Sequence, residues 1–180
     1  MDRKMKVLIT GGNGYIAKSL YKSLKYKHDI TTISREDFNL TDLEDTKHWF
    51  YDRRFDVVIH TAVVGGTRLK DENSSILDQN LKMYYNLLHH NHKFTKLINF
   101  GSGAEFINPP SPYGLSKQVI AKSMEDKPNF YNLRIYGVFD ENEWDTRFIK
   151  TCIKNHIEKK PMEVFENKEM DFIYMKDLIS

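Results

Sequence analysis

The chain has 180 residues, and 27 Lys and Arg against 25 Asp and Glu give it a formal net charge of +2. This near balance argues against a nucleic-acid-binding protein, which usually carries a basic excess. No apolar run approaches the roughly 18 residues of a membrane span, and the N-terminal MDRKMKV lacks the apolar stretch of a signal peptide. A single cysteine, Cys152, can form no internal disulfide, and no Cys/His cluster indicates a metal site. We therefore expect a cytoplasmic globular protein without membrane or nucleic-acid partners.

Short apolar runs alternate with segments of helical periodicity. Strands are expected at residues 6–10, 30–34, 57–61, 96–101 and 130–136. Several of these runs are almost continuously apolar, which is typical of strands buried on both faces of a sheet. Apolar residues three and four apart predict helices at 16–24 and 76–90, and Asp42 is a candidate N-cap for a further helix through Trp49 and Phe50. The alternation predicts an α/β fold, a doubly wound parallel sheet of the Rossmann type.

A glycine-rich turn follows the first expected strand. Residues 6–17 read KVLITGGNGYIA, so Gly11, Gly12 and Gly14 stand between a strand and a helix, where such a turn binds a dinucleotide. Gly11 would make the tight turn, and Gly14 would let the backbone approach the pyrophosphate at the positive end of the helix. Ala17 replaces the third glycine of the motif and is small enough for close packing of helix on strand.

The end of the second expected strand bears on the choice between NAD and NADP. Arg35 stands where a guanidinium could pair with the 2′-phosphate of NADP. Glu36 and Asp37 follow it and could instead bind the 2′-hydroxyl of NAD. We favour NADP and keep NAD as the alternative.

A tyrosine and a lysine lie four residues apart in SPYGLSKQ, residues 111–118. On a helix Tyr113 and Lys117 share one face, and a nearby ammonium favours the phenolate. Tyr113 is therefore a candidate proton donor or acceptor near neutral pH. Ser102 follows another expected strand at its carboxyl end, the edge where ligands bind in this architecture, and its hydroxyl could bond a substrate oxygen.

These motifs together carry a family resemblance. TGGNGYIA, HTAVVGG at 60–66, Ser102 and YGLSK resemble the extended short-chain dehydrogenase/reductases of the NAD-dependent epimerase/dehydratase family, which act on nucleotide sugars. LRIYGVF at 133–139 and DFIYMKDL at 171–178 are similar to later motifs of that family. Within the family, SREDFNLTD and the glycine pair of VVGG are most similar to the GDP-fucose synthase group.

The resemblance implies roles for individual residues. Tyr113 would be the general acid or base, Lys117 would hold the nicotinamide ribose and tune the tyrosine, and Ser102 would orient the substrate oxygen. The implied cofactor-binding residues, besides Tyr113 and Lys117, are Gly11, Asn13, Gly14, Tyr15, Ile16, Arg35, Asn39, Leu40, Thr61, Ala62 and Val63. The helix at 76–90 is apolar on more than one face, and its family counterpart pairs with a second copy, which implies a homodimer.

Departures from the family shape the expected function. Ala104 stands where the fucose synthases have a cysteine, and no histidine lies between His92 and His156, so both epimerisation residues of that group are absent. The leading hypothesis is an NAD(P)-dependent keto-sugar reductase, epimerase or dehydratase that acts on a nucleotide sugar through the Ser-Tyr-Lys site. We expect a Rossmann domain at 1–140 and, because family members continue past Ser180, a reduced C-terminal substrate-binding appendage at 141–180. The alternative is a non-catalytic NAD(P)-binding sensor or subunit.

Overall fold

A computed structural model describes residues 3–67, 71–107, 110–164, 167 and 169–180. The chain divides into two compact units, Met1–Arg134 and Ile135–Ser180, which are described in turn. The separate functions expected of an N-terminal and a C-terminal part stay predictions.

Five strands form the sheet of the first unit, in the order β2-β1-β3-β4-β5. Their bounds are Lys6–Thr10 for β1, Asp29–Ile33 for β2, Phe55–His60 for β3, Phe94–Ser102 for β4 and Phe130–Ile135 for β5. β1 pairs in parallel with β2 and with β3, and β3 pairs in parallel with β4. The predicted parallel sheet is confirmed, and every expected strand is present with its ends shifted by two residues or fewer.

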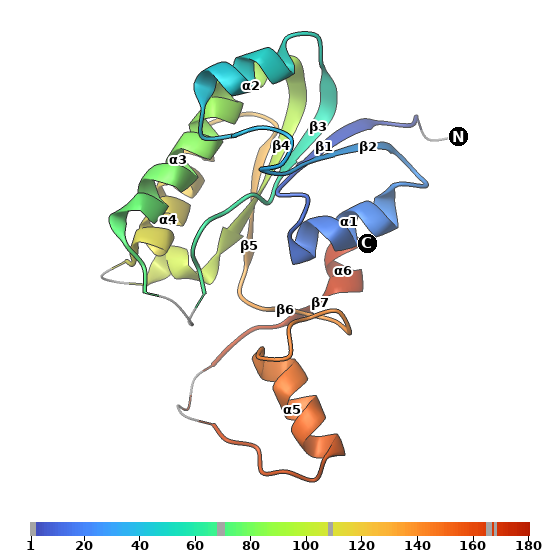
Figure 1. Ribbon diagram of the computed structural model, residues 1–180, viewed down its shortest axis with the longest axis vertical. Helices are drawn as coiled ribbons and strands as arrows, with labels where there is room; N and C mark the ends of the chain where they lie inside the picture. The colour runs from blue at the N-terminus through green and yellow to red at the C-terminus, as the bar shows by residue number, and fades with distance from the viewer. Residues whose placement is uncertain (1–2, 68–70, 108–109, 165–166, 168) are drawn as a thin grey trace. The chain divides into compact units, whose positions relative to one another are not determined.

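Helices cover both faces of this sheet. They are α1 (Tyr15–Leu24), α2 (Leu43–Phe50), α3 (Ser74–His89) and α4 (Pro112–Met124), with short 3₁₀ turns η1 (Asn91–Lys93) and η2 (Gly103–Phe106). In Figure 1, α1 lies on one side of the strands, whereas α2, α3 and α4 lie on the other. Asp42 caps α2 as predicted, because its carboxylate accepts the backbone N–H groups of Glu44 and Asp45.

The main hydrophobic core lies between the sheet and α2, α3 and α4. Its largest fully buried side chains include Tyr84, Phe50, Leu8 and Leu97. On the α1 face Ala17 is completely buried, so the small residue predicted to replace a glycine does allow α1 to pack closely. Both faces of the central strands are therefore covered, as their continuous apolar runs predicted.

The strand order places a switch point at β1. β2 lies on one side of β1 and β3 on the other, so the connections that leave β1 and β2 run in opposite directions. In open α/β sheets the ends of the strands at such a point leave a crevice for a ligand. The glycine turn after β1 and the segment after β3 both begin at this edge.

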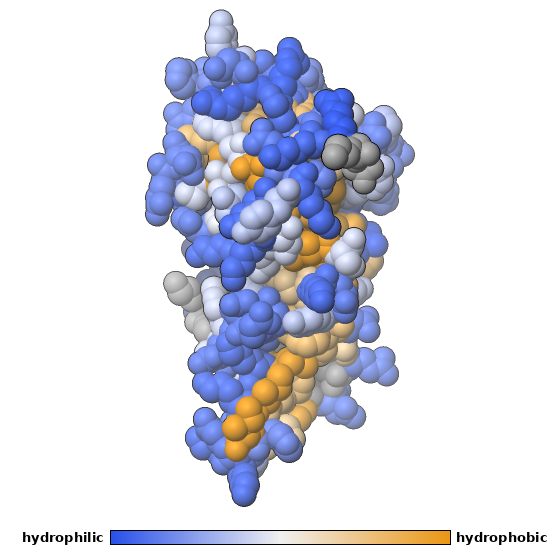
Figure 2. Space-filling model, turned by 90° about the vertical axis from the view of Figure 1, so that its right-hand side faces the viewer, coloured by the Kyte–Doolittle hydropathy of each residue, from blue (hydrophilic) through white to orange (hydrophobic). Residues whose placement is uncertain are grey.

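The second unit is a small mixed element. Its strands β6 (Val138–Phe139) and β7 (Ile173–Tyr174) pair in parallel, and its helices are α5 (Phe148–Ile157) and α6 (Met175–Ile179). Large apolar side chains stay exposed on α5 and just after it: Phe148, Ile153, Ile157, Met162 and Val164. Figure 2 shows apolar colour on the lower part of the molecule, where Figure 1 draws α5.

None of the helices within the described residues combines the length and the apolar character that a bilayer crossing requires.

Candidate active site

The glycine turn after β1 is built for close approach of the backbone. Gly11 has a φ of +73°, and a Cβ added there would lie 2.8 Å from the Cα of Ala62. The N–H of Gly12 donates to the carbonyl of Ile33 at 2.8 Å, which ties the turn to the end of β2. Any side chain at position 11 would therefore strain the backbone and collide with the segment that follows β3.

The start of α1 suits an anionic group. Gly14 is its N-cap, offers no side-chain hydrogen bond to the helix, and no acidic residue lies in the first turn. The N-terminal N–H groups of a helix and its dipole favour a phosphate in this setting. These features fit the pyrophosphate of a dinucleotide, the group that the sequence predicted for this turn.

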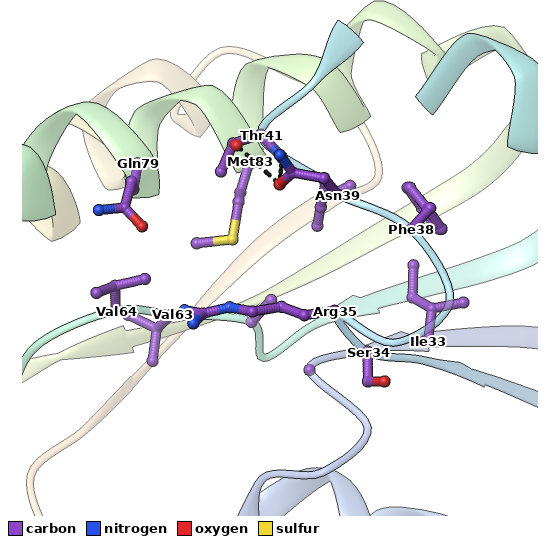
Figure 3. A pocket seen from close by; sticks show the side chains of 13 residues that line it. Ile33, Ser34, Arg35, Phe38, Asn39, Thr41, Val63, Val64, Gln79 and Met83 are labelled. Carbon is purple, nitrogen blue, oxygen red and sulfur yellow. Dashed lines mark hydrogen bonds between the residues drawn. The ribbon is translucent and has the colours of Figure 1, made fainter. Parts of the chain in front are cut away.

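A cavity of about 440 Å³ opens beside the glycine turn. It is lined by Gly11, Ile33, Ser34, Arg35, Phe38, Asn39, Leu40, Thr41, Ala62, Val63, Val64, Gln79 and Met83. Its walls come from the ends of β1, β2 and β3 together with α3. Figure 3 shows the Arg35 side chain extending across the cavity from the end of β2 toward Val63, with Asn39 and Met83 on the opposite wall.

The acidic neighbours of Arg35 are placed differently. Neither Glu36 nor Asp37 lines the cavity, and the carboxylate of Asp37 accepts the N–H of Ser34 at 2.7 Å and its hydroxyl at 3.1 Å. Asp37 thus closes a local turn, whereas the guanidinium of Arg35 reaches the cavity. A basic group in this cavity favours a ligand that carries an additional phosphate.

A buried histidine supports the segment that follows β3. His60 is 3% exposed, and its Nδ1 lies 2.8 Å from the hydroxyl of Thr10. Burial, together with a smaller effect of the Lys117 charge, lowers the pKa of His60 to about 3, so the ring is neutral at physiological pH. The Thr10 hydroxyl also accepts the N–H of Ala62, and Thr61 donates to the carbonyl of Thr10. Residues 61 and 62 are thereby fixed to the end of β1.

Two glycines and an asparagine shape the rest of this segment. Gly65 and Gly66 have φ values of +82° and +74°, a conformation that favours glycine over other residues. The buried side chain of Asn80 on α3 accepts the N–H of Val64, donates to its carbonyl and donates to the hydroxyl of Ser116 on α4. One amide therefore joins the segment after β3 to α3 and α4.

Tyr113 and Lys117 meet on one face of α4, as their spacing predicted. The Lys117 ammonium lies 5.7 Å from the centroid of the Tyr113 ring and donates to the carbonyl of Phe100 on β4 at 2.5 Å. Lys117 is 6% exposed, and this burial lowers its pKa to about 8, although the nearby Glu105 carboxylate acts in the opposite direction. The ring of Tyr113 packs on the backbone of Gly66, where a Cβ would lie 2.8 Å from its Cζ.

Ser102 ends β4 and begins the η2 turn. Its hydroxyl accepts the N–H of Ala104 at 3.2 Å, which leaves the hydroxyl proton available for another acceptor. The turn lies directly against the first turn of α4, since a Cβ on Gly114 would lie 2.8 Å from the carbonyl oxygen of Ala104. The serine and the Tyr-Lys pair therefore belong to segments in contact with each other.

Not every expected residue lines the cavity. The expected cofactor-binding residues that line it are Gly11, Arg35, Asn39, Leu40, Ala62 and Val63. The expected residues that do not are Asn13, Gly14, Tyr15, Ile16, Thr61, Tyr113 and Lys117. Their roles in cofactor binding or catalysis stay predictions. Within the described part of the chain, no three His, Cys, Asp or Glu side chains gather closely enough to hold a metal ion.

Two acidic residues that the sequence analysis did not single out support the site. Glu72 accepts the N–H of Gly66 at 3.0 Å and the N–H of Tyr113 at 3.1 Å. Glu105 is 3% exposed and accepts the N–H of Ser102 at 2.9 Å. A signal for Glu105 was present, since serine followed three residues later by glutamate is the signature of a capping box. Glu72 is brought to Tyr113 only by the tertiary fold.

The sequence of this chain is similar to known proteins. A family model described as NAD dependent epimerase/dehydratase family matches residues 7–180. CDP-abequose synthase of Yersinia pseudotuberculosis is 25% identical over 201 residues, covering 97% of this chain and 71% of the relative.

Solved structures share the fold. The Bordetella bronchiseptica enzyme WbmG, in complex with NAD and UDP, aligns with a TM-score of 0.79 and 21% identity over 98% of this chain and 67% of its own. A GDP-L-fucose synthetase from Naegleria fowleri bound to NADP aligns with a TM-score of 0.72 and 18% identity over 99% of this chain and 72% of its own. The expected Rossmann-type fold is confirmed.

Proposed function

Because the chain belongs to the NAD dependent epimerase/dehydratase family, whose members are enzymes that modify nucleotide sugars, we propose that it is an NADP-dependent reductase of a nucleotide-linked keto sugar. The observation that carries the proposal is the placement of Lys117 5.7 Å from the Tyr113 ring on a helix beside the end of β4. That pair supplies a proton at the edge of the sheet where the switch point would hold the cofactor.

The cofactor has a matching set of groups on this chain. The backbone of the glycine turn and the start of α1 would hold the pyrophosphate, and Leu40 and Val63 would enclose the adenosine. Arg35 would pair with the 2′-phosphate, which supports NADP over NAD, since Asp37 is engaged with Ser34. When bound, the nicotinamide supplies the hydride that reduces a ketone.

The protein's own part of the reaction is to deliver a proton to the oxygen that becomes a hydroxyl. Tyr113 gives up its phenolic proton, and the positive charge of Lys117 stabilises the phenolate that remains. Ser102 donates its hydroxyl proton in a hydrogen bond to the same oxygen. His60 stays neutral near Lys117, because burial and the Lys117 charge together lower the pKa of His60 to about 3, so it adds no competing positive charge.

The substrate class rests on the relatives. CDP-abequose synthase is by name an enzyme of a CDP-linked sugar, and the WbmG structure contains UDP. Ala104, in place of the cysteine that the fucose synthases use, supports reduction without epimerisation. We assign cofactor binding to the N-terminal part of the chain and contacts with the sugar nucleotide to the C-terminal part.

We further propose a homodimer through α3, which light scattering on the purified protein would test.

The test is a titration with NADPH and NADH, followed by nicotinamide fluorescence, in the absence and presence of CDP-, GDP-, UDP- and dTDP-4-keto sugars. We expect NADPH to bind more tightly than NADH and to be oxidised with one of the sugars. Binding without oxidation of NADPH on any sugar would favour a non-catalytic NADP-binding protein. Absence of binding by both nucleotides would contradict the cofactor site itself.

A further inference from the structure

Resting on the proposed function, we infer that Glu105 is a positioning residue, whose buried carboxylate fixes the turn that carries Ser102 against the helix that carries Tyr113 and Lys117. The residue is 3% exposed, and its side chain lies between the end of β4 and β5. It touches none of the reacting atoms, so its effect on the reaction passes through Ser102 and Lys117.

The carboxylate is surrounded by donors from two strands. Oε1 accepts the N–H of Ser102 at 2.9 Å, and Oε2 accepts the Nε of Arg134 at 2.6 Å. Asn132 donates to both oxygens at 3.2 and 3.3 Å, and its own carbonyl oxygen accepts from Asn99 at 2.7 Å. In a capping box on a surface turn, the carboxylate faces water instead of being surrounded by protein donors. Here the acid joins the Ser102 turn to β5 as well.

A glycine makes room for this network. A Cβ on Gly101 would collide with the Glu105 carboxylate and would lie 2.7 Å from the side-chain oxygen of Asn132. The absence of a side chain at position 101 lets the network close directly against the backbone of β4, one residue before Ser102.

The same turn is attached to α4 by its backbone. The carbonyl of Glu105 accepts the side-chain amide of Gln118 at 3.2 Å, and Gln118 follows Lys117 in the helix. Lys117 in turn donates to Phe100, two residues before Ser102. Ser102 lies within residues 100–105, Lys117 is hydrogen-bonded to them, and Gly114, which follows Tyr113, packs on Ala104. The Glu105 carboxylate holds that segment in shape.

Loosening this segment would misplace the Ser102 hydroxyl relative to Tyr113. A shift of about 1 Å in a reacting geometry can cost about 100-fold in rate. The glycine turn and Arg35 follow β1 and β2, which lie on the opposite side of the sheet from β5. Loosening the segment at 100–105 should therefore affect cofactor binding much less than turnover.

The experiment compares Glu105→Gln with Glu125→Gln in the full chain. Glu125 is a half-exposed acid at the end of α4 that pairs with the surface Lys122, so it controls for loss of one carboxylate. For Glu105→Gln we expect kcat to fall about 10- to 100-fold while the Kd for NADPH changes less than about threefold. Parallel loss of kcat and NADPH affinity, or a loss explained by the unfolded fraction alone, would overturn the inference.

A second variant keeps the test decisive if Glu105→Gln does not fold. Arg134 is 45% exposed and its removal leaves the contact between Glu105 and Ser102 in place. We expect Arg134→Gln to fold and to lower kcat only a few-fold, with an unchanged Kd for NADPH. An Arg134→Gln variant that loses kcat and NADPH affinity together would count against the inference.

The pH profile gives a readout that a purely structural role would not move. Among the residues that the structure describes, the charged or titratable groups near the Lys117 ammonium are Glu105 from η2, His60 from β3 and Tyr113 from its own helix. Removing the negative charge of Glu105 lowers the pKa of Lys117 further below its ordinary value. The high-pH limb of kcat/KM should therefore move to lower pH in Glu105→Gln and stay in place in Glu125→Gln.

Failure of the proposed function is distinguishable from failure of this inference. If the unmodified protein oxidises NADPH with no sugar, the proposed function fails, and amide hydrogen exchange then tests Glu105 without a substrate. We expect exchange at Ser102 and Ala104 to become at least about tenfold faster in Glu105→Gln but not in Glu125→Gln. Unchanged exchange at these amides would overturn the inference whatever the protein catalyses.

Discussion

The two ends of the candidate site are built by different means. At the ends of β1 and β3 the chain relies on backbone, with Gly11, Gly65 and Gly66 at positive φ. At the end of β4 it relies on buried charge, with Lys117 at 6% exposure and Glu105 at 3%. The first end presents N–H groups and a cavity, whereas the second holds a lysine whose pKa is lowered to about 8 by burial.

This difference separates binding from chemistry. A glycine-lined edge binds an anionic ligand through fixed dipoles that need no change of protonation. Burying a lysine beside a tyrosine costs free energy, because its charge loses water. The resulting shift of its pKa toward neutral is useful where a proton must move at about pH 7. Substitutions at the two ends should accordingly affect different parameters, and the following predictions test that separation in order of expected size.

The largest effect is expected at the proposed proton donor. Tyr113→Phe keeps the ring that packs on Gly66 but removes the phenolic hydroxyl. Turnover with the keto sugar should fall by about 1,000-fold, since general acid catalysis contributes about 10² to 10⁴. The Kd for NADPH should change less than about twofold. Tyr51→Phe, at an exposed position just after α2, is the control that should retain full turnover.

The backbone-built end should respond through binding and stability. Gly11→Ala introduces a Cβ 2.8 Å from the Cα of Ala62 at a φ of +73°. We expect a loss of about 2–3 kcal/mol in unfolding free energy and loss of measurable NADPH binding. Gly12→Ala is the matched control, because a Cβ at this position would lie 3.1 Å from the side chain of Thr32. Urea unfolding should show a smaller loss of unfolding free energy for this variant. Equal losses for both variants would contradict the special role of Gly11.

The sequence predicted the backbone-built end better than the charge-built end. Glycines between a strand and a helix are local, so Gly11, Gly14 and the small Ala17 could be recognised without the fold. Tyr113 and Lys117 share a helix, and their meeting followed from spacing alone. Glu72 and Arg134 act on residues 41 and 29 positions away, through hydrogen bonds that exist only after β-strands and helices have packed.

The choice of cofactor should depend on Arg35. Arg35→Gln removes the guanidinium that lines the cavity, and we expect the Kd for NADPH to rise about 10- to 100-fold, as for loss of a charge-assisted hydrogen bond. The Kd for NADH should change little. Fluorescence titration of both nucleotides measures the ratio, with Glu36→Gln as a neighbouring control. A similar loss of affinity for NADPH and NADH would assign Arg35 a role other than recognition of the 2′-phosphate.

The smallest effect is expected at Glu72, which links the two ends by accepting the N–H groups of Gly66 and Tyr113. Burial alone would raise the pKa of Glu72, but hydrogen bonds from Ser111, Gly66 and Tyr113 outweigh it and lower the pKa below its ordinary value. A carboxyl with a lowered pKa stabilises the folded state above its unfolded pKa, and this contribution is lost as the pH falls through the folded pKa. Glu72→Gln should therefore reduce the unfolding free energy by about 1 kcal/mol at about pH 7, with the difference shrinking below about pH 4. Urea unfolding of both proteins across this range measures it, and a difference that stays constant with pH would show that packing of the side chain, rather than its charge, joins the two ends.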